Sequence, residues 1–152
     1  MPKLSAGIML YRSRDGRTEV LIAHPGGPFW ARKDEAAWSI PKGEYTEEEE
    51  PLDAARREFR EELGLDVPGG EVAELGVIKQ SGGKIVTAFA IGADLDITGA
   101  VSNEFEMEWP PRSGTMKSFP EVDRVAWFDV ETARVKLLKG QRPFLDRLLD
   151  LL

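Results

Sequence analysis

Residues 43–65 read GEYTEEEEPLDAARREFREELGL, and this stretch predicts a helix whose two ends can be recognised. Pro51 suits the first helical turn, where its missing N–H breaks no bond. Leu52, Ala55, Phe59 and Leu63 follow one another at three- and four-residue intervals, the spacing of a buried helix face. Gly64 comes directly after them, as is typical of a helix end. We therefore predict a helix over residues 51–63 that packs one face into the core.

The same helix gathers negative charge. Glu58, Glu61 and Glu62 stand at i, i+3 and i+4, so their side chains share one face. Like charges this close repel and raise one another's pKa unless a positive charge compensates them. Mg²⁺ and Mn²⁺ prefer carboxylate and water oxygens as ligands. Arg57 can also hold a carboxylate through two parallel hydrogen bonds, and Glu49 in the preceding loop is its natural partner.

The order of residues along the stretch is more informative than its charge. A Glu-rich run is usually a solvated surface, and Glu47, Glu48 and Glu50 fit that interpretation. The whole stretch, however, follows the pattern GX5EX7REUXEEXGU, where U is an apolar residue. At ordinary residue frequencies a chance match is on the order of 10⁻⁷ per window. The stretch is similar to the Nudix box at every specified position, so the chain resembles the Nudix hydrolase family.

The resemblance implies a fold, a reaction and a set of site residues. Members have an α/β/α sandwich with a mixed sheet and hydrolyse, with Mg²⁺ or Mn²⁺, a nucleoside diphosphate linked to another group. The fixed positions of the motif imply three roles: metal binding and proton abstraction by Glu58, Glu61 and Glu62, a metal contact through the backbone carbonyl of Gly43, and orientation by the pair Arg57 and Glu49.

Many members supply a further carboxylate from a distant loop that precedes a strand containing Trp. Glu121 lies in that context, before residues 122–127, and could bind metal or act as the general base. An ordinary loop carboxylate is the alternative. We leave the identity of the base open between Glu58 and Glu121. Glu104, Glu106 and Glu108 alternate and would share one face of a strand, either lining the same cleft or forming a solvated edge.

The remaining chain predicts a mixed α/β or α+β domain. We expect strands over residues 4–11, 19–23, 38–40, 71–80, 84–95 and 125–128, with a possible short strand at 104–109. Further helices are expected over 130–138 and 141–152. The apolar C-terminal helix could serve the core or a dimer interface, so the protein is a monomer or a homodimer. No linker or repeat divides residues 1–152, which we expect to form one domain.

Composition limits the classes of partner. The chain has 152 residues, no cysteine and a formal net charge of −7. The lack of cysteine excludes a disulfide framework and a thiolate metal site. The acidic balance disfavours sequence-independent nucleic-acid binding and RNA-cap removal as functions. The N-terminal run MPKLSAGIMLYR is too short in apolar residues for a signal peptide, and no stretch reaches membrane-spanning length, which predicts a cytoplasmic protein.

We expect the substrate to be a small nucleotide, and the residues next to the motif indicate which class of nucleotide it is. Lys42 gives the order Pro-Lys-Gly, which resembles members acting on diadenosine polyphosphates and diphosphoinositol polyphosphates. A lysine there can place a charge on an extra phosphate. Arg112 and Lys117, in a predicted loop, are weaker candidates for phosphate contact. The leading substrate is a dinucleoside polyphosphate such as diadenosine tetraphosphate. The alternatives are an oxidised nucleoside triphosphate, ADP-ribose or a nucleotide sugar, or a non-catalytic nucleotide-binding module.

Aromatic residues cluster before the motif. Phe29, Trp30 and Trp38 could stack on a base, although Trp is more often a core residue. We keep Trp30 and Trp38 as candidate substrate contacts. His24 is the only histidine, and we expect it to have a structural role.

Overall fold

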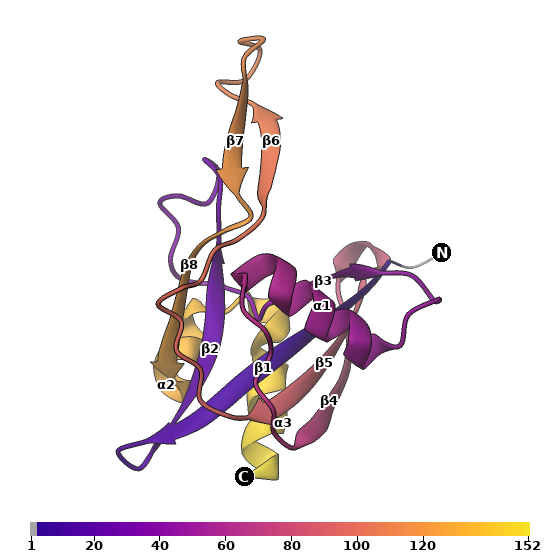
Figure 1. Cartoon of the computed structure of the whole chain (residues 1–152), viewed down its shortest axis with the longest axis vertical. Helices are drawn as coiled ribbons and strands as arrows, with labels where there is room; N and C mark the ends of the chain where they lie inside the picture. Colours follow the sequence, from indigo (N-terminus) through magenta and orange to yellow (C-terminus); the bar gives the residue numbers. More distant parts are fainter. Residues whose placement is uncertain (1–2) are drawn as a thin grey trace.

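The central element of the fold is a mixed β-sheet (Figure 1). The computed structural model describes residues 3–152, so the first two residues of the N-terminal run lie outside it. Strands β4, β5, β1, β2 and β8 follow one another across the sheet, and the short β3 also pairs with β1. β1 and β5 are parallel, whereas the other pairs are antiparallel. The bounds are β1 Leu4–Arg14, β2 Arg17–Pro25, β3 Lys42–Tyr45, β4 Val72–Lys79, β5 Ile85–Gly92 and β8 Val122–Asp129.

Helices cover both faces of this sheet, which confirms the predicted α/β/α sandwich. α1 (Pro51–Leu63) packs on one face, and α2 (Val130–Lys136) and α3 (Arg142–Leu151) pack on the other. Successive side chains of a strand point to opposite faces. Ile8 and Leu10 therefore join the cluster under α1, while Met9 joins the cluster under α2 and α3. The first half of β1 is buried on both faces and also pairs with β3, the strand at the start of the motif. Short 3₁₀ turns η1 (Ser81–Gly83) and η2 (Lys139–Gln141) complete the helical elements.

The C-terminal helix α3 belongs to the core. Phe144, Leu145 and Leu148 are fully buried, whereas Leu149 and Leu152 are 39% and 59% exposed. Three of the apolar residues that could have formed an interface are thus used inside the chain. Within residues 3–152, no helix is both long enough and apolar enough to cross a membrane.

The strand predicted at residues 38–40 is wrong. Trp38 and Ser39 form only isolated bridges, to Leu137 and Ala23. The strand begins at Lys42, where β3 pairs with β1 opposite Gly7. A side chain at Gly7 would come within 2.7 Å of the Lys42 Cβ, so glycine permits the close approach. The pairing therefore depends on a residue far away in sequence.

A β-hairpin of β6 (Glu104–Glu108) and β7 (Met116–Pro120) projects from the sandwich (Figure 1). The possible strand at 104–109 is confirmed. The predicted loop around Arg112 and Lys117 is wrong in part, because Lys117 lies in β7 opposite Met107. β7 escaped prediction because Met116, Lys117 and Ser118 are all exposed and show no alternation of apolar and polar residues.

Candidate active site

The ends of α1 place its acidic face against β3. Gly64 adopts the left-handed conformation, with φ of 68°, and its N–H donates to the Arg60 carbonyl. The N–H groups of Val101 and Asn103 then donate to the carbonyls of Leu63 and Glu61, 2.8 and 3.2 Å away. These bonds use carbonyls that the helix leaves free at its C-terminus. The carboxyl end of α1 is therefore tied to residues 101–103, just before β6.

Arg57 organises the acidic face. Its Nε and Nη2 donate to both oxygens of Glu49 at 2.9 and 2.8 Å, the two-bond contact expected from sequence. Its Nη1 donates to Glu58 Oε1 at 2.8 Å and reaches Glu61 at 3.3 Å. The bonds from Arg57 hold the pKa of Glu49 below its usual range. Arg57 thus supplies a positive charge that compensates these neighbouring carboxylates.

Glu58 lies directly over Gly43. A side chain at position 43 would meet Glu58 Oε2 at 1.9 Å, so only glycine leaves room for this carboxylate. Burial raises the pKa of Glu58, against the lowering effect of Arg57, and the negative charges of Glu61 and Glu121 raise it further. Glycine at position 43 therefore has a steric reason. The predicted metal contact through its carbonyl stays a prediction.

Glu62 is the most perturbed carboxylate of the cluster. Burial raises its pKa to about 8, although the Lys42 backbone N–H donates a hydrogen bond to it and the Lys42 side chain attracts it. The negative charges of Glu58 and Glu121 raise the pKa further. A carboxyl group that is hard to ionise and lies beside two other carboxylates is suited to a bound cation.

Glu121 lies near this cluster although it is more than fifty residues away from it in the sequence. Its N–H donates to the Asn103 carbonyl at 2.8 Å, and its carbonyl accepts from Gly26 N–H at 2.9 Å. Its charge acts on both Glu58 and Glu62. The structure thus brings the predicted distal carboxylate to the box helix.

Two lysines, Lys42 and Lys84, lie beside the cluster. Burial lowers the pKa of Lys42, as does the nearby charge of Lys84, while Glu62, Glu44 and Glu58 oppose the shift. Lys84 also lies 4.0 Å from Glu44. Lys84 is not among the predicted site residues, because it follows η1 and lies more than forty residues after Lys42 in the sequence. By contrast, Arg112 and Lys117 are exposed on the hairpin that projects away from α1 (Figure 1), so the fold does not gather them with Lys42.

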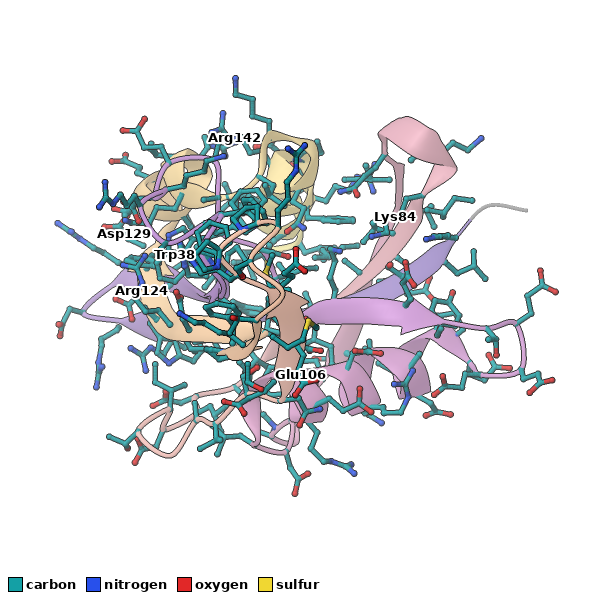
Figure 2. All side chains as sticks on the ribbon, turned by 90° about the horizontal axis from the view of Figure 1, so that it is seen from above. Trp38, Lys84, Glu106, Arg124, Asp129 and Arg142 are labelled. Carbon is teal, nitrogen blue, oxygen red and sulfur yellow. The ribbon has the colours of Figure 1, made fainter. Side chains whose placement is uncertain are left out.

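The two candidate stacking residues differ in exposure. Trp38 is 3% exposed and belongs to the core, with its ring edge-on to His24 and Phe128. Figure 2 shows Trp38 among closely set side chains, on the same side of the molecule as Arg124 and Asp129. This burial leaves it no free face for a base, so its assignment as a substrate contact is wrong. Trp30 is only partly buried and lies in the loop after β2.

His24 has the expected structural contacts. It is fully buried, with Nδ1 2.7 Å from Asp123 Oδ1 and Nε2 2.6 Å from the Lys33 carbonyl. It therefore joins β2 to the start of β8 and to the loop after β2.

The carboxylates fit a divalent cation by chemistry rather than by their present geometry. Among residues 3–152, no three acidic or histidine side chains are close enough together to hold a metal ion. Glu58 and Glu61 are instead drawn toward Arg57. Hard oxygen donors from Glu58, Glu61, Glu62 and Glu121 nevertheless converge on one region, and oxygen donors of this kind are the ligands that Mg²⁺ and Mn²⁺ prefer.

The chain is similar to known proteins over nearly its whole length. A family model described as the NUDIX domain matches residues 1–148. Over 65 residues the chain is 37% identical to an RNA pyrophosphohydrolase of Bartonella henselae. The matched segment covers 40% of this chain and 35% of the relative. The match thus spans about a third of that relative's length.

Solved structures with a similar fold include the following two examples. The NUDIX domain of Shewanella oneidensis NrtR, complexed with ADP ribose, gives a TM-score of 0.67 at 13% identity, covering 99% of this chain and 88% of that one. A Caenorhabditis elegans Ap4A hydrolase binary complex gives 0.62 at 18% identity, covering 98% and 96%. At these identities the likeness concerns the fold alone.

Proposed function

The chain belongs to the NUDIX family, and on that premise we propose that it is a metal-dependent pyrophosphohydrolase acting on a nucleoside diphosphate-linked compound. The observation that carries the proposal is the convergence of Glu58 and Glu62 on α1 with the distant Glu121. A nucleotide-binding surface with no chemistry to perform has no need to bury a carboxylate among others. The alternative of a non-catalytic module is further weakened because every acidic position of the motif is retained.

Each residue has a proposed role. Glu58, Glu61, Glu62 and Glu121 would hold Mg²⁺ or Mn²⁺, which supplies charge neutralisation at the phosphates and acidifies water. Arg57, anchored by Glu49, positions Glu58 and Glu61. Either Glu58 or Glu121 accepts the proton of the attacking water, and burial raises the pKa of Glu58, which makes it a stronger base than a free carboxylate. Lys42, with Lys84 nearby, neutralises charge on the phosphate chain.

Within this class we propose a dinucleoside polyphosphate, such as diadenosine tetraphosphate, as the substrate. Two lysines beside the box loop favour a substrate with more phosphates than ADP-ribose carries. RNA with a 5′-triphosphate is a second candidate, because the Bartonella henselae relative is named for action on RNA.

The test is a panel assayed with Mg²⁺ in ¹⁸O-labelled water: diadenosine tetraphosphate, 8-oxo-dGTP, ADP-ribose and 5′-triphosphorylated RNA. We expect diadenosine tetraphosphate to give the highest kcat/KM, and the label to identify the phosphorus attacked. If another compound is turned over far faster, the choice of substrate is wrong. If nothing is hydrolysed and Glu62→Gln binds nucleotides as the parent does, the enzymatic proposal itself fails.

A further inference from the structure

A pocket of about 510 Å³ lies beside Glu121, outside the acidic cluster. Its walls are the loop over residues 25–30, Phe105 and Met107 of β6, and Glu121 itself. The volume lies within the range of pockets that hold small molecules, roughly 300–1,000 Å³. One residue is thus shared between this pocket and the carboxylates of the active site.

The pocket is built by contacts between segments distant in sequence. On β6, Phe105 and Met107 are partly buried, while the alternating Glu104, Glu106 and Glu108 are exposed. The glutamates therefore form the solvated edge, and the apolar pair faces the loop. That loop approaches closely, since a side chain at Gly27 would meet the Phe105 ring at 2.9 Å. The Gly26 N–H bonded to the Glu121 carbonyl closes the third side.

The pocket offers few polar groups to a ligand. Apart from the Glu121 carboxylate and the indole N–H of Trp30, its side chains are apolar, and Phe29 and Trp30 stand on the loop side. Pro25 and Pro28 have no N–H, and the N–H of Gly26 is already bonded. Most of the surface that the pocket offers to a ligand therefore favours apolar contact and stacking. The negative charge of Glu121 at the same time disfavours a phosphate in the pocket.

On the basis of the proposed function, we propose that this pocket holds one nucleobase of the substrate by stacking, without reading the polar groups of the base. The phosphates then lie toward the cluster of Glu58 and Glu62, on the other side of Glu121. Stacking tolerates different bases because each has a flat aromatic face. An apolar pocket also discriminates weakly against an added polar group. The enzyme therefore accepts adenine, guanine and 8-oxoguanine alike.

The first experiment measures binding of AMP and of ribose 5-phosphate, which lacks the base, by titration calorimetry with Mg²⁺. We expect AMP to bind at least about 10-fold more tightly to the parent protein, as stacking predicts. Met107→Ala lowers that ratio several-fold, whereas Met116→Ala does not, because Met116 is 59% exposed on β7 and outside the pocket. Met107→Trp fills the pocket and weakens AMP but not ribose 5-phosphate. Equal binding of the two ligands by the parent protein, or an unchanged ratio in Met107→Ala, overturns the proposal.

The second experiment compares kcat/KM for diadenosine and diguanosine tetraphosphate and for dGTP and 8-oxo-dGTP. Within each pair we expect less than about 10-fold preference. A preference above 100-fold within either pair shows polar readout of the base and refutes the proposal. A protein that hydrolyses the panel but gains nothing from the base loses only this proposal. A protein that binds AMP through the base and hydrolyses nothing instead overturns the proposed reaction.

Discussion

Replacing Glu62 by Gln is expected to stabilise the metal-free protein while it removes activity. Glu62 is partly buried, and burial raises its pKa from 4.5 to about 8. The folded state therefore binds the proton more tightly than the unfolded state does. The stabilisation that this provides is complete below about pH 4.5 and is lost as the pH rises to about 8. Gln has the same shape and stays neutral, so the variant escapes this loss.

The size of the effect follows from the pKa shift. At about 1.4 kcal/mol for each pKa unit, ionising Glu62 in the folded state costs up to about 5 kcal/mol. Water penetration and relaxation of the neighbouring groups reduce this figure, so we expect about 2–4 kcal/mol. For a chain of this size that corresponds to a rise in Tm of roughly 5–15 °C at pH 9. At pH 4.5 parent and variant should differ little.

The assay is thermal and urea unfolding in EDTA at pH 4.5, 7 and 9, repeated with excess Mg²⁺. Glu48→Gln, at an exposed position of the preceding loop, is the matched control and should behave as the parent does. Mg²⁺ should stabilise the parent more than Glu62→Gln, because a ligand of the folded state adds its binding free energy. If the stability difference between parent and variant is the same at all three pH values, the burial argument for Glu62 is refuted.

Three further predictions concern residues around the cluster. Gly43→Ala forces a methyl group into the Glu58 carboxylate and should lower kcat/KM at least about 100-fold, whereas Gly69→Ala, with open space around it, should not. Arg57→Lys keeps the charge but loses the two-bond contact, and should reduce kcat by about 10–100-fold, measured at saturating Mg²⁺. Gln141→Ala removes a fully buried acceptor for a backbone N–H; it should cost about 1–3 kcal/mol in urea unfolding and leave KM unchanged.

The sequence predicted what depends on local spacing. The bounds of α1, its buried face and the stop at Gly64 agree with the structure, because helix geometry is set within a few residues. The contact between Arg57 and Glu49 was also predictable, since Glu49 lies just before α1 and Arg57 lies less than two turns into that helix. The mixed sheet followed from the family resemblance rather than from any strand pattern.

Prediction failed where pairing joins distant segments. Residues 38–40 are apolar enough for a strand, yet the partner edge of β1 accepts β3 instead, where Gly7 allows close approach. Trp38 is exposed to no base in this fold, because the end of α2 and strand β8 cover its ring. On β6 the alternation predicts one shared face for the glutamates, and the same pattern places Phe105 and Met107 on the opposite face. That period-2 pattern was the available indication of Phe105 and Met107.

One backbone junction explains why the acidic cluster and the pocket keep a fixed relation. Asn103 precedes β6 and Glu121 follows β7. The hydrogen bond from the Glu121 N–H to the Asn103 carbonyl therefore closes the base of the hairpin. Asn103 also donates to the Glu61 carbonyl at the end of α1. The helix that carries the box, the distal carboxylate and the strand that lines the pocket are thus joined through main-chain bonds. Because these bonds do not depend on side-chain identity, substitutions along the hairpin can alter what the pocket accepts while Glu121 stays beside Glu58 and Glu62. The chemistry and the choice of substrate are therefore separable in this fold, although they share a carboxylate.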